Sequence, residues 1–429
     1  MKMKRDIPLL IRSAVFAAAF SLLLTGCSSS HPGVSPSSSA PAATPPSVDA
    51  TPTPISSPSP TSTPVATSGV TAMTLEEKLG QMIIAGIDEY SMNAHARELI
   101  EAYHVGGIIL YKPNVKNTTQ LVDLVNELKQ TNAVNKLPLW LGVDEEGGRV
   151  TRLPDEIMKT PTSMDIGKTG RPVLAYNIGQ LLGKELNAYG LNMDFAPDLD
   201  VNSNPNNPVI GDRSFGSNAS IVGSFGVQMM NGLQNQKVVP VVKHFPGHGD
   251  TSIDSHVGLP IVQNDLARLR KLELVPFAEA FKHQADAVMV AHILLPKVDA
   301  QNPASMSKKI MTDLLRKEMG FEGLIMTDDM TMGAIITNYD LGEAAVKSVL
   351  AGSNIVMVGH DYEKVVTVID ALRKAVQSGR IPMETINQSV RQVTKVKQKY
   401  QLTDRPIKVP DTKKLNAEVQ SVLGTKANK

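Results

Sequence analysis

After Met73 the chain repeats one pattern, in which a short apolar run is followed by a longer amphipathic stretch. Near-continuous apolar runs of this length are typical of strands buried on both faces of a parallel sheet. The longer stretches, such as 121–131, 172–188 and 265–283, have the period and length of helices. The apolar runs are 82–86, 107–111, 139–143, 193–197, 238–242, 287–291, 323–327 and 354–358.

Eight strands joined by helical crossovers predict an α/β fold, a closed (β/α)8 barrel of the TIM type forming a single catalytic domain. A doubly wound open sheet is the alternative. No GxGxxG motif and no P-loop follows the first run, which disfavours the nucleotide-binding form of that fold. Thr74 with Glu77 three residues later predicts a capped helix start. We expect the barrel to span 73–410, including a helix at 383–400, and a C-terminal tail with a short helix to span 411–429.

Residues 1–26 have the parts of a bacterial export signal. A basic segment at 2–12 precedes an apolar run at 14–24, which is too short to span a bilayer. The run ends in Leu24-Thr25-Gly26-Cys27, and Cys27 is the only cysteine. This segment resembles the lipobox of bacterial lipoproteins, which implies cleavage before Cys27 and its lipidation; an ordinary signal peptide is the alternative. We therefore expect a lipid anchor at the extracytoplasmic face of the cell membrane, and no internal disulfide.

The segment 27–72 is rich in Ser, Pro, Thr and Ala, which predicts a disordered linker between the lipidated cysteine and the barrel. At about 3 Å per residue, such a segment could hold the domain on the order of 100 Å from the membrane. The net charge of +1 and an aromatic content of 4% disfavour nucleic acid as a partner. We expect a monomer.

Polar residues follow five consecutive apolar runs, where a (β/α)8 barrel carries its active site. They are Asp144-Glu145-Glu146-Gly147-Gly148-Arg149, Asp198 and Asp200 with Gly211 to Gly216, Lys243-His244, His292, and Asp328-Asp329. We expect these groups to meet on one rim. For Asp200 and Asp329 a capping role is as compatible as a catalytic one, and Arg149 is expected to pair with an acid. His95, His104, His283 and His360 are expected at the surface or at helix ends, outside this rim.

The densest chemistry lies in the loop Lys243-His244-Phe245-Pro246-Gly247-His248-Gly249-Asp250-Thr251-Ser252-Ile253-Asp254-Ser255-His256. A carboxylate at Asp254 could orient the imidazole of His256 and raise its basicity, so that the pair moves a proton near neutral pH. His248, between two glycines, could simply pin the loop. Asp328 could act as a carboxylate nucleophile. A nucleophile and an acid/base match the two steps of retaining glycoside hydrolysis, with histidine replacing the usual second carboxylic acid.

The same loop also has a metal-binding interpretation, because His244, His248, Asp250, Asp254 and His256 offer nitrogen and oxygen ligands. Their spacing matches no common zinc signature such as HExxH. We therefore expect neither a metal nor another cofactor.

Taken together, these motifs resemble the bacterial β-N-acetylglucosaminidases of glycoside hydrolase family 3, from about Met73 to Leu402. The resemblance rests on 144–150, 211–216, the loop 243–256 and Thr327-Asp328-Asp329-Met330. It implies that Asp328 is the nucleophile and that His256, held by Asp254, is the acid/base. It also implies that the substrate is bound by Asp144, Arg152, Arg213, Lys243 and His244.

Two departures from the family pattern are visible. Glu145 stands where the family's motif usually has Gln, and we expect the chain to lack the extra C-terminal domain of many Gram-positive members. The resemblance predicts a retaining exo-β-N-acetylglucosaminidase that removes terminal GlcNAc from peptidoglycan fragments or related amino sugars. The alternatives are a β-N-acetylglucosaminide phosphorylase or transglycosidase on the same fold, and a sugar-binding lipoprotein. A histidine acid/base would suit a phosphorylase because it does not repel incoming phosphate.

Overall fold

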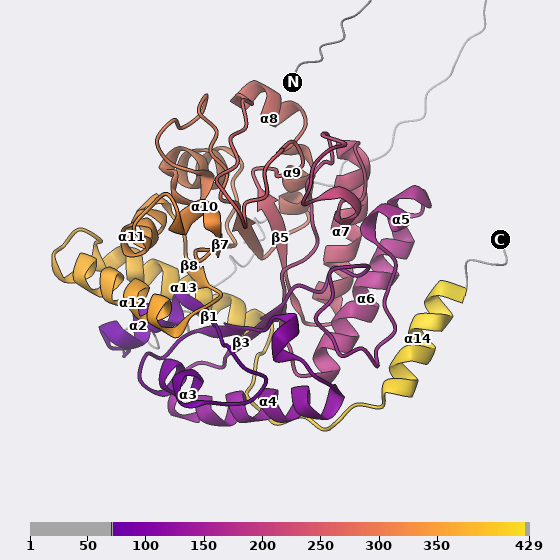
Figure 1. Cartoon of the computed structure of the whole chain (residues 1–429), viewed down its shortest axis with the longest axis horizontal. Helices are drawn as coiled ribbons and strands as arrows, with labels where there is room; N and C mark the ends of the chain where they lie inside the picture. The colour runs from indigo at the N-terminus through magenta and orange to yellow at the C-terminus, as the bar shows by residue number, and fades with distance from the viewer. Residues whose placement is uncertain (1–69, 71, 425–429) are drawn as a thin grey trace, which may run out of the picture. The chain divides into compact units, whose positions relative to one another are not determined.

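The computed structural model of this 429-residue chain describes residue 70 and residues 72–424 (Figure 1). The expected export signal, the lipidation site Cys27 and nearly all of the expected linker lie outside the described residues. Within the described part, no helix is both long enough and apolar enough to cross a membrane.

Eight parallel strands form a closed barrel in which each strand pairs with the next and β8 pairs with β1, so the predicted fold is confirmed. The register is continuous around the closure, since Ile84 of β1 is partnered by both Gly107 of β2 and Met357 of β8. The strands are β1 (Ile83–Gly86), β2 (Gly107–Ile109), β3 (Trp140–Val143), β4 (Met193–Asp194), β5 (Val239–Phe245), β6 (Ala287–Val290), β7 (Leu324–Asp329) and β8 (Ile355–Val358).

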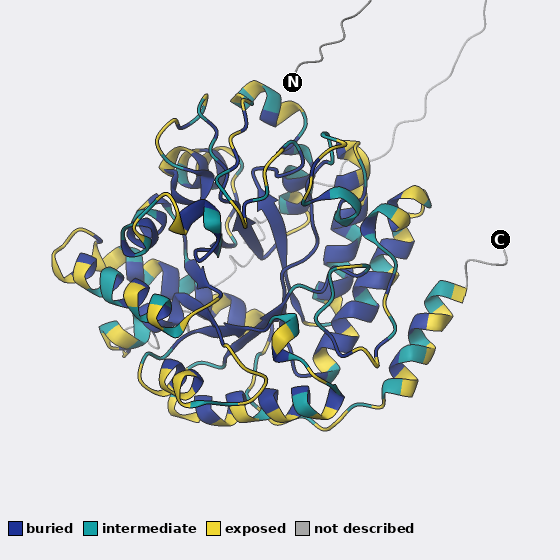
Figure 2. Cartoon of the chain, viewed as in Figure 1, coloured by how far each residue is buried: buried dark blue, intermediate teal, exposed yellow. Residues whose placement is uncertain are grey.

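Helices surround the barrel and bury one face each (Figure 2). The α-helices are α2 (Leu75–Gln81), α3 (Ala94–Glu101), α4 (Thr118–Thr131), α5 (Ser163–Lys168), α6 (Pro172–Ala188), α7 (Ala219–Asn235), α8 (Leu266–Lys271), α9 (Val275–Lys282), α10 (Gly333–Ile336), α11 (Leu341–Ala351), α12 (Tyr362–Gln377), α13 (Met383–Lys399) and α14 (Thr412–Gly424). A π-helix covers Lys309–Glu318, and 3-10 turns cover Lys112–Asn114, Asn132–Val134, Gly211–Arg213 and Ala304–Met306.

Of two predictions about where helices begin and end, one is confirmed and one is wrong. The predicted cap is confirmed: Glu77 N donates to Thr74 Oγ1 at 3.2 Å, and Thr74 N donates to Glu77 Oε2 at 2.7 Å. The single helix predicted over 265–283 is wrong, because the chain forms α8 and α9 instead. Pro276 has no N–H to bond the carbonyl one turn earlier, so a continuous helix could not run through it.

The barrel interior is filled by apolar side chains from alternate strand positions, including Trp140, Phe195 and Met326. Helix α13 covers one end, where Val393, Val396 and Tyr400 join this interior cluster. Fully buried Lys397 lies there as well and donates to Gln81 Oε1, Gly106 O and Pro138 O at 2.6–2.9 Å. With this end closed, the C-terminal ends of the strands are left as the open end of the barrel.

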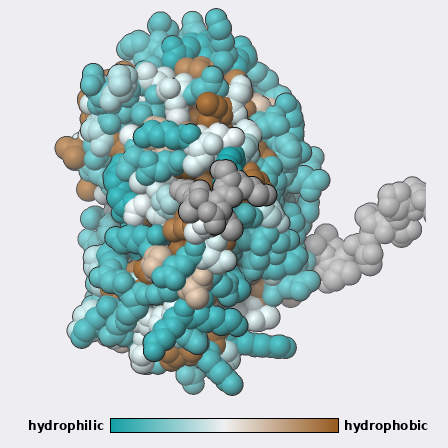
Figure 3. All heavy atoms as spheres, turned by 90° about the vertical axis from the view of Figure 1, so that its right-hand side faces the viewer, coloured by the Kyte–Doolittle hydropathy of each residue, from teal (hydrophilic) through white to brown (hydrophobic). Residues whose placement is uncertain are grey.

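The last described helix, α14, follows an extended segment and packs against α6 through an ion pair between Lys184 and Glu418. Asn416 adds two bonds at 2.8 Å, accepting from Met158 N and donating to Glu156 O. The helix predicted after Asp411 is therefore confirmed. The face that includes this region is mainly hydrophilic, with hydrophobic residues in small separate groups (Figure 3).

Candidate active site

A cavity of about 290 Å³ opens among the residues that follow the C-terminal ends of the strands. All eight residues that the sequence singled out for catalysis or substrate binding line it: Asp144, Arg152, Arg213, Lys243, His244, Asp254, His256 and Asp328. These residues therefore lie together at the C-terminal ends of the strands, as expected for such a barrel. Their chemical roles remain predictions.

Lys243 lies at the floor of this cavity, with a side chain that is only 1% exposed. Its Nζ donates to Asp144 Oδ1 at 2.6 Å and lies 2.7 Å from Glu146 Oε1. Burial alone would lower the pKa of Lys243, but the two carboxylates outweigh it and raise that pKa. Burial likewise would raise the pKa of Asp144, and the charges of Lys243 and Arg152 lower it instead. All these groups are therefore charged at neutral pH.

Arg213 is held by a two-pronged ion pair with Glu146. Its Nε and NH2 atoms donate to the two carboxylate oxygens of Glu146 at 2.8 and 2.7 Å. The cations Arg213 and Lys243 hold the pKa of Glu146 well below its usual range, against the effect of burial. Because bidentate pairs fix the guanidinium plane, Glu146 positions Arg213 toward the cavity.

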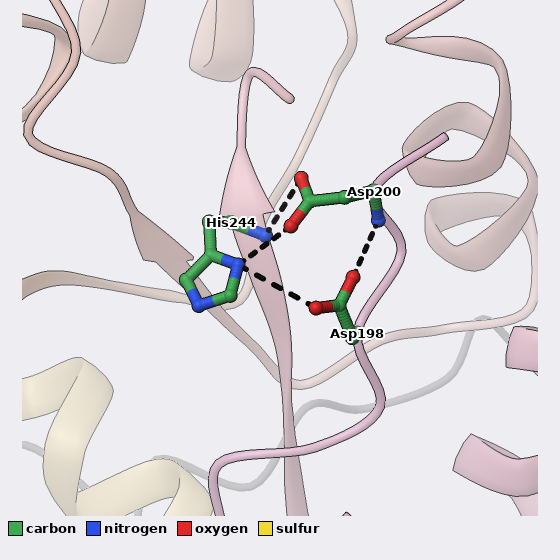
Figure 4. A group of neighbouring side chains, drawn as sticks. All are labelled: Asp198, Asp200 and His244. Atoms are coloured by element: carbon green, nitrogen blue, oxygen red, sulfur yellow. Dashed lines mark hydrogen bonds and ion pairs between the residues drawn. The ribbon is translucent and has the colours of Figure 1, made fainter. Parts of the chain in front are cut away.

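His244 is held in one tautomer by Asp200, with Asp198 nearby (Figure 4). Burial, reinforced by the charge of Arg213, lowers the pKa of His244 to about 4, so the ring is neutral. Its Nδ1–H donates to Asp200 Oδ2 at 2.6 Å, which leaves Nε2 to accept from Arg213 NH2 at 3.4 Å. Asp200 also accepts from His248 N at 2.6 Å. Asp200 is therefore a positioning residue, and it caps no helix.

Asp198, Asp200 and His244 are also the described side chains whose ligand atoms come close enough together to suggest a metal ion. Three observations disfavour that interpretation. The bond of 2.6 Å between His244 and Asp200 is a proton-sharing distance, and the Arg213 Nε lies 3.8 Å from Asp198 Oδ2, where it would repel a cation. Burial and the charge of Asp200 raise the pKa of Asp198 well above its usual value, which disfavours the ionised form that a metal ligand needs. The five-residue metal set proposed from the loop is not gathered into one site.

Asp328 and Asp329 end β7 side by side but face different surroundings. Asp329 accepts from Thr331 N, Thr331 Oγ1 and Gly359 N at 2.7–2.9 Å, and so ties β7 to the segment after β8. Asp328 accepts one described hydrogen bond, from Asp329 N at 2.8 Å, and its carboxylate lines the cavity. Burial opposes ionisation of Asp328, yet the nearby His292 and His244 and this N–H together lower its pKa. An ionised, lightly bonded carboxylate suits a nucleophile.

The loop that carries Asp254 and His256 is pinned by His248, as the sequence suggested. The buried His248 ring bonds Thr251 Oγ1 at 2.8 Å and Ser255 Oγ at 3.1 Å. Asp254 Oδ1 accepts from the backbone N–H of His256 at 2.9 Å rather than from its ring. The expected carboxylate–imidazole bond is therefore not formed in this conformation, and a side-chain rotation would be needed to make it.

His360 was expected at the surface or at a helix end, outside the rim; its side chain is exposed, but it lines the cavity after β8. Tyr111, which lines the cavity after β2, and Glu146, which holds Arg213, were not among the predicted catalytic or substrate-binding residues. Tyr111 ends the apolar run 107–111, and His360 lies two residues after the run 354–358. The rule that polar groups at strand ends form the rim would therefore have found both residues if it had been extended to these two strands. Arg149 lines the cavity, and its Nε lies 2.6 Å from Asp212 Oδ1. The predicted pairing of Arg149 with an acid is therefore confirmed.

Glu145, the departure from the family motif, points away from the cavity. Its Oε2 accepts from Thr151 Oγ1, Arg152 N and Leu153 N at 2.8–3.2 Å. Burial raises the pKa of Glu145. This residue therefore shapes the loop after β3, and the acid that faces the cavity is Asp144.

A strand-end carboxylate and a histidine loop at the open end of a (β/α)8 barrel are compatible with a glycosidase. Residues 74–396 match the N-terminal domain of glycosyl hydrolase family 3. The chain belongs to this family and is a β-N-acetylhexosaminidase.

Known relatives support this assignment. The chain is 33% identical to beta-hexosaminidase LpqI of Mycobacterium tuberculosis, over 90% of this chain and 97% of that one. It is 33% identical to beta-hexosaminidase A of Pseudoalteromonas piscicida, over 82% and 67% of the two chains. Among solved structures, it superposes on a family 3 β-N-acetylglucosaminidase from Paenibacillus sp. FPU-7 with a TM-score of 0.77 and 42% identity, covering 82% and 68%.

Proposed function

We propose that this protein is a retaining exo-β-N-acetylglucosaminidase that removes terminal GlcNAc by way of a covalent glycosyl-aspartate. The observation that carries the proposal is the carboxylate of Asp328, which has a lowered pKa and faces a cavity rich in paired charges. At about 290 Å³ the cavity is at the small end of ligand sites, which suits one terminal sugar ring.

In the first step, Asp328 attacks the anomeric carbon while the bond to the leaving oxygen breaks. Protonated His256 gives its proton to that oxygen, and Asp254 steadies the imidazolium. In the second step, neutral His256 takes a proton from water, the water oxygen bonds to the anomeric carbon, and Asp328 leaves. Two displacements at one carbon retain its configuration.

The sugar itself would be held by the buried charged groups. Asp144 offers carboxylate oxygens to sugar hydroxyls, while Arg152, Arg213 and Lys243 offer donors. Because Asp144 and Glu146 already fix these cations, their donors are positioned before the substrate arrives.

For the physiological substrate we propose peptidoglycan fragments, acted on at the outer side of the membrane by a monomeric enzyme anchored through Cys27. The support is the lipobox-like segment of the sequence and the similarity to relatives named beta-hexosaminidase and β-N-acetylglucosaminidase. Release of the protein from membranes by Cys27→Ala, with unchanged hydrolysis, would agree with this location. A Cys27→Ala protein that stays in the membrane fraction would contradict it.

The function is tested by hydrolysis of an aryl β-N-acetylglucosaminide, with the anomer of the product followed by NMR. The wild type should release β-GlcNAc first, and Asp328→Ala should be inactive. Full activity of Asp328→Ala, or initial release of the α-anomer, would refute the mechanism. The alternative of a phosphorylase rests on His256 standing in place of a carboxylic acid. It is decided by adding phosphate, since a sugar 1-phosphate as the main product would establish it.

A further inference from the structure

The segment after β8 forms part of the cavity wall at its mouth. The ring of His360 stacks on the ring of Tyr111, with centroids 4.5 Å apart and planes inclined by 24°. Both residues line the cavity, and the side chain of His360 is 59% exposed. Since Tyr111 covers one face of the imidazole, the exposed part includes the other face and an edge.

This aromatic pair is held in place by its neighbours. Gly359 N donates to Asp329 Oδ1 at 2.7 Å. A Cβ at Gly359 would lie 2.2 Å from the Tyr111 hydroxyl and 2.5 Å from Asp329 Oδ2, so only glycine allows this close approach. Asp361 has a φ of 72° and caps α12 by accepting from Glu363 N at 3.0 Å. Strained backbone of this kind concentrates at functional sites.

The exposed fraction of its side chain separates His360 from the charged groups. The side chains of Lys243, Arg213 and Asp144 are 1%, 12% and 18% exposed, against 59% for His360. A terminal sugar held by the buried charges would leave the next part of the substrate at the mouth, beside His360. A flat ring with a polar edge can pack on the C–H face of a pyranose and bond its hydroxyls.

We propose that the Tyr111–His360 pair binds the second sugar ring of the substrate, the one that leaves when the glycosidic bond is cut. This inference rests on the proposed function and adds to it a site for the leaving group. His360 thereby favours substrates in which a pyranose, rather than a small alcohol, follows the terminal GlcNAc.

The chain supplies a matched control. His95 stacks on Tyr362 with centroids 4.3 Å apart and planes inclined by 11°, and neither residue lines the cavity. Replacing His95 removes a comparable stacked pair from the surface, and so reports what the loss of stacking alone does to the fold.

The test compares His360→Ala, His360→Phe and His95→Ala on the disaccharide GlcNAc-β1,4-GlcNAc. His360→Ala should lower kcat/KM about tenfold, the size of one lost ring contact, and His360→Phe should recover most of it. The inhibition constant of free GlcNAc should not change, because the monosaccharide occupies only the buried site. His95→Ala should behave as the wild type.

An unchanged kcat/KM in His360→Ala would overturn the proposal, as would a GlcNAc inhibition constant that rises in parallel with the loss. Failure of the proposed function is distinguishable, since the wild type itself would then not cleave the disaccharide. Calorimetry can measure the affinities of the disaccharide and of GlcNAc for Asp328→Asn, with and without the added substitution His360→Ala. This comparison tests whether His360 binds the second sugar, without any turnover. Equal loss of affinity for both sugars would count against it, and loss for the disaccharide alone would support it.

Discussion

The backbone N–H of Gly333 donates to the carbonyl oxygen of His256 at 3.2 Å. Ala334 N donates in the same way to Ser255 O at 3.0 Å. The loop of the proposed acid/base is thus seated on the start of α10, a few residues after Asp328 in β7. The position of the proton donor is therefore tied to the strand that carries the proposed nucleophile.

Gly333→Ala should displace this loop. A Cβ there would lie 2.6 Å from His256 O and 2.7 Å from Val257 O, and both of these are backbone atoms that cannot rotate away. Misplacement by about 1 Å should lower kcat/KM roughly 100-fold for a substrate whose leaving group needs a proton. The measurement is a comparison of aryl glycosides with good and poor leaving groups, where the good one should lose much less.

Gly258→Ala is the control for Gly333→Ala. It lies in the same loop, and its Cβ would meet only Ile253 Cγ2, at 3.9 Å. Its kinetics should match the wild type. Equal losses with both leaving groups in Gly333→Ala would show that the substitution harms more than proton delivery.

Glu146→Gln should destabilise the fold. The change would remove the carboxylate that pairs with buried Arg213 and Lys243. Breaking a buried ion pair typically costs about 3 to 5 kcal/mol. The free energy of unfolding, measured with urea at pH 7, reports this loss. Asp155→Asn is the control, because Asp155 pairs with Lys112 at the surface and should change stability by less than about 1 kcal/mol.

The pKa of Glu146 also predicts how the stability of the fold depends on pH. The pKa of Glu146 is lower in the folded state than in the unfolded one, so its stabilising effect is complete above the unfolded value of about 4.3. The effect is lost as the pH falls through the folded pKa. Glu146→Gln should therefore lose less stability than the wild type on acidification below about pH 4. Parallel curves for the two proteins would argue against this role.

Glu145→Gln should keep full activity and gain stability at alkaline pH. Burial raises the pKa of Glu145, so its ionisation disfavours the folded state as the pH rises above the unfolded value. The amide oxygen of Gln can still accept from Arg152 N and Leu153 N without carrying a charge. Urea unfolding should show a larger stability gain at pH 8 than at pH 5; a variant less stable than the wild type at both would contradict this.

His256→Ala should reveal its role through the leaving group. Without an acid, departure of a poor leaving group should slow by about 100-fold or more, whereas a strongly activated phenolate needs no proton. Hydrolysis of a series of aryl β-N-acetylglucosaminides should therefore show a steeper dependence on leaving-group pKa than in the wild type. Unchanged dependence would assign proton transfer to another residue.

Much of the fold could be predicted because its signals are local. The eight apolar runs and the Thr74 cap depend on residues close in sequence, and the strand-end rule then placed Asp144, Lys243 and Asp328 on one rim. The error over α8 and α9 was also local, since Pro276 marks the break. The misplacement of His360 came from applying the same rule to only five of the eight strand ends.

The sequence alone determined the barrel class and the chemical types at its open end, because hydrophobic period and strand order are properties of the chain itself. Only the tertiary structure decided which charges neutralise each other, as when Lys243 meets Asp144 and Glu146. It also decided that His360 lies on Tyr111, because closure of the barrel places β8 next to β1 and so only one strand away from β2, which Tyr111 follows. Such contacts between distant residues depend on side-chain packing in three dimensions, which no local pattern of residues encodes.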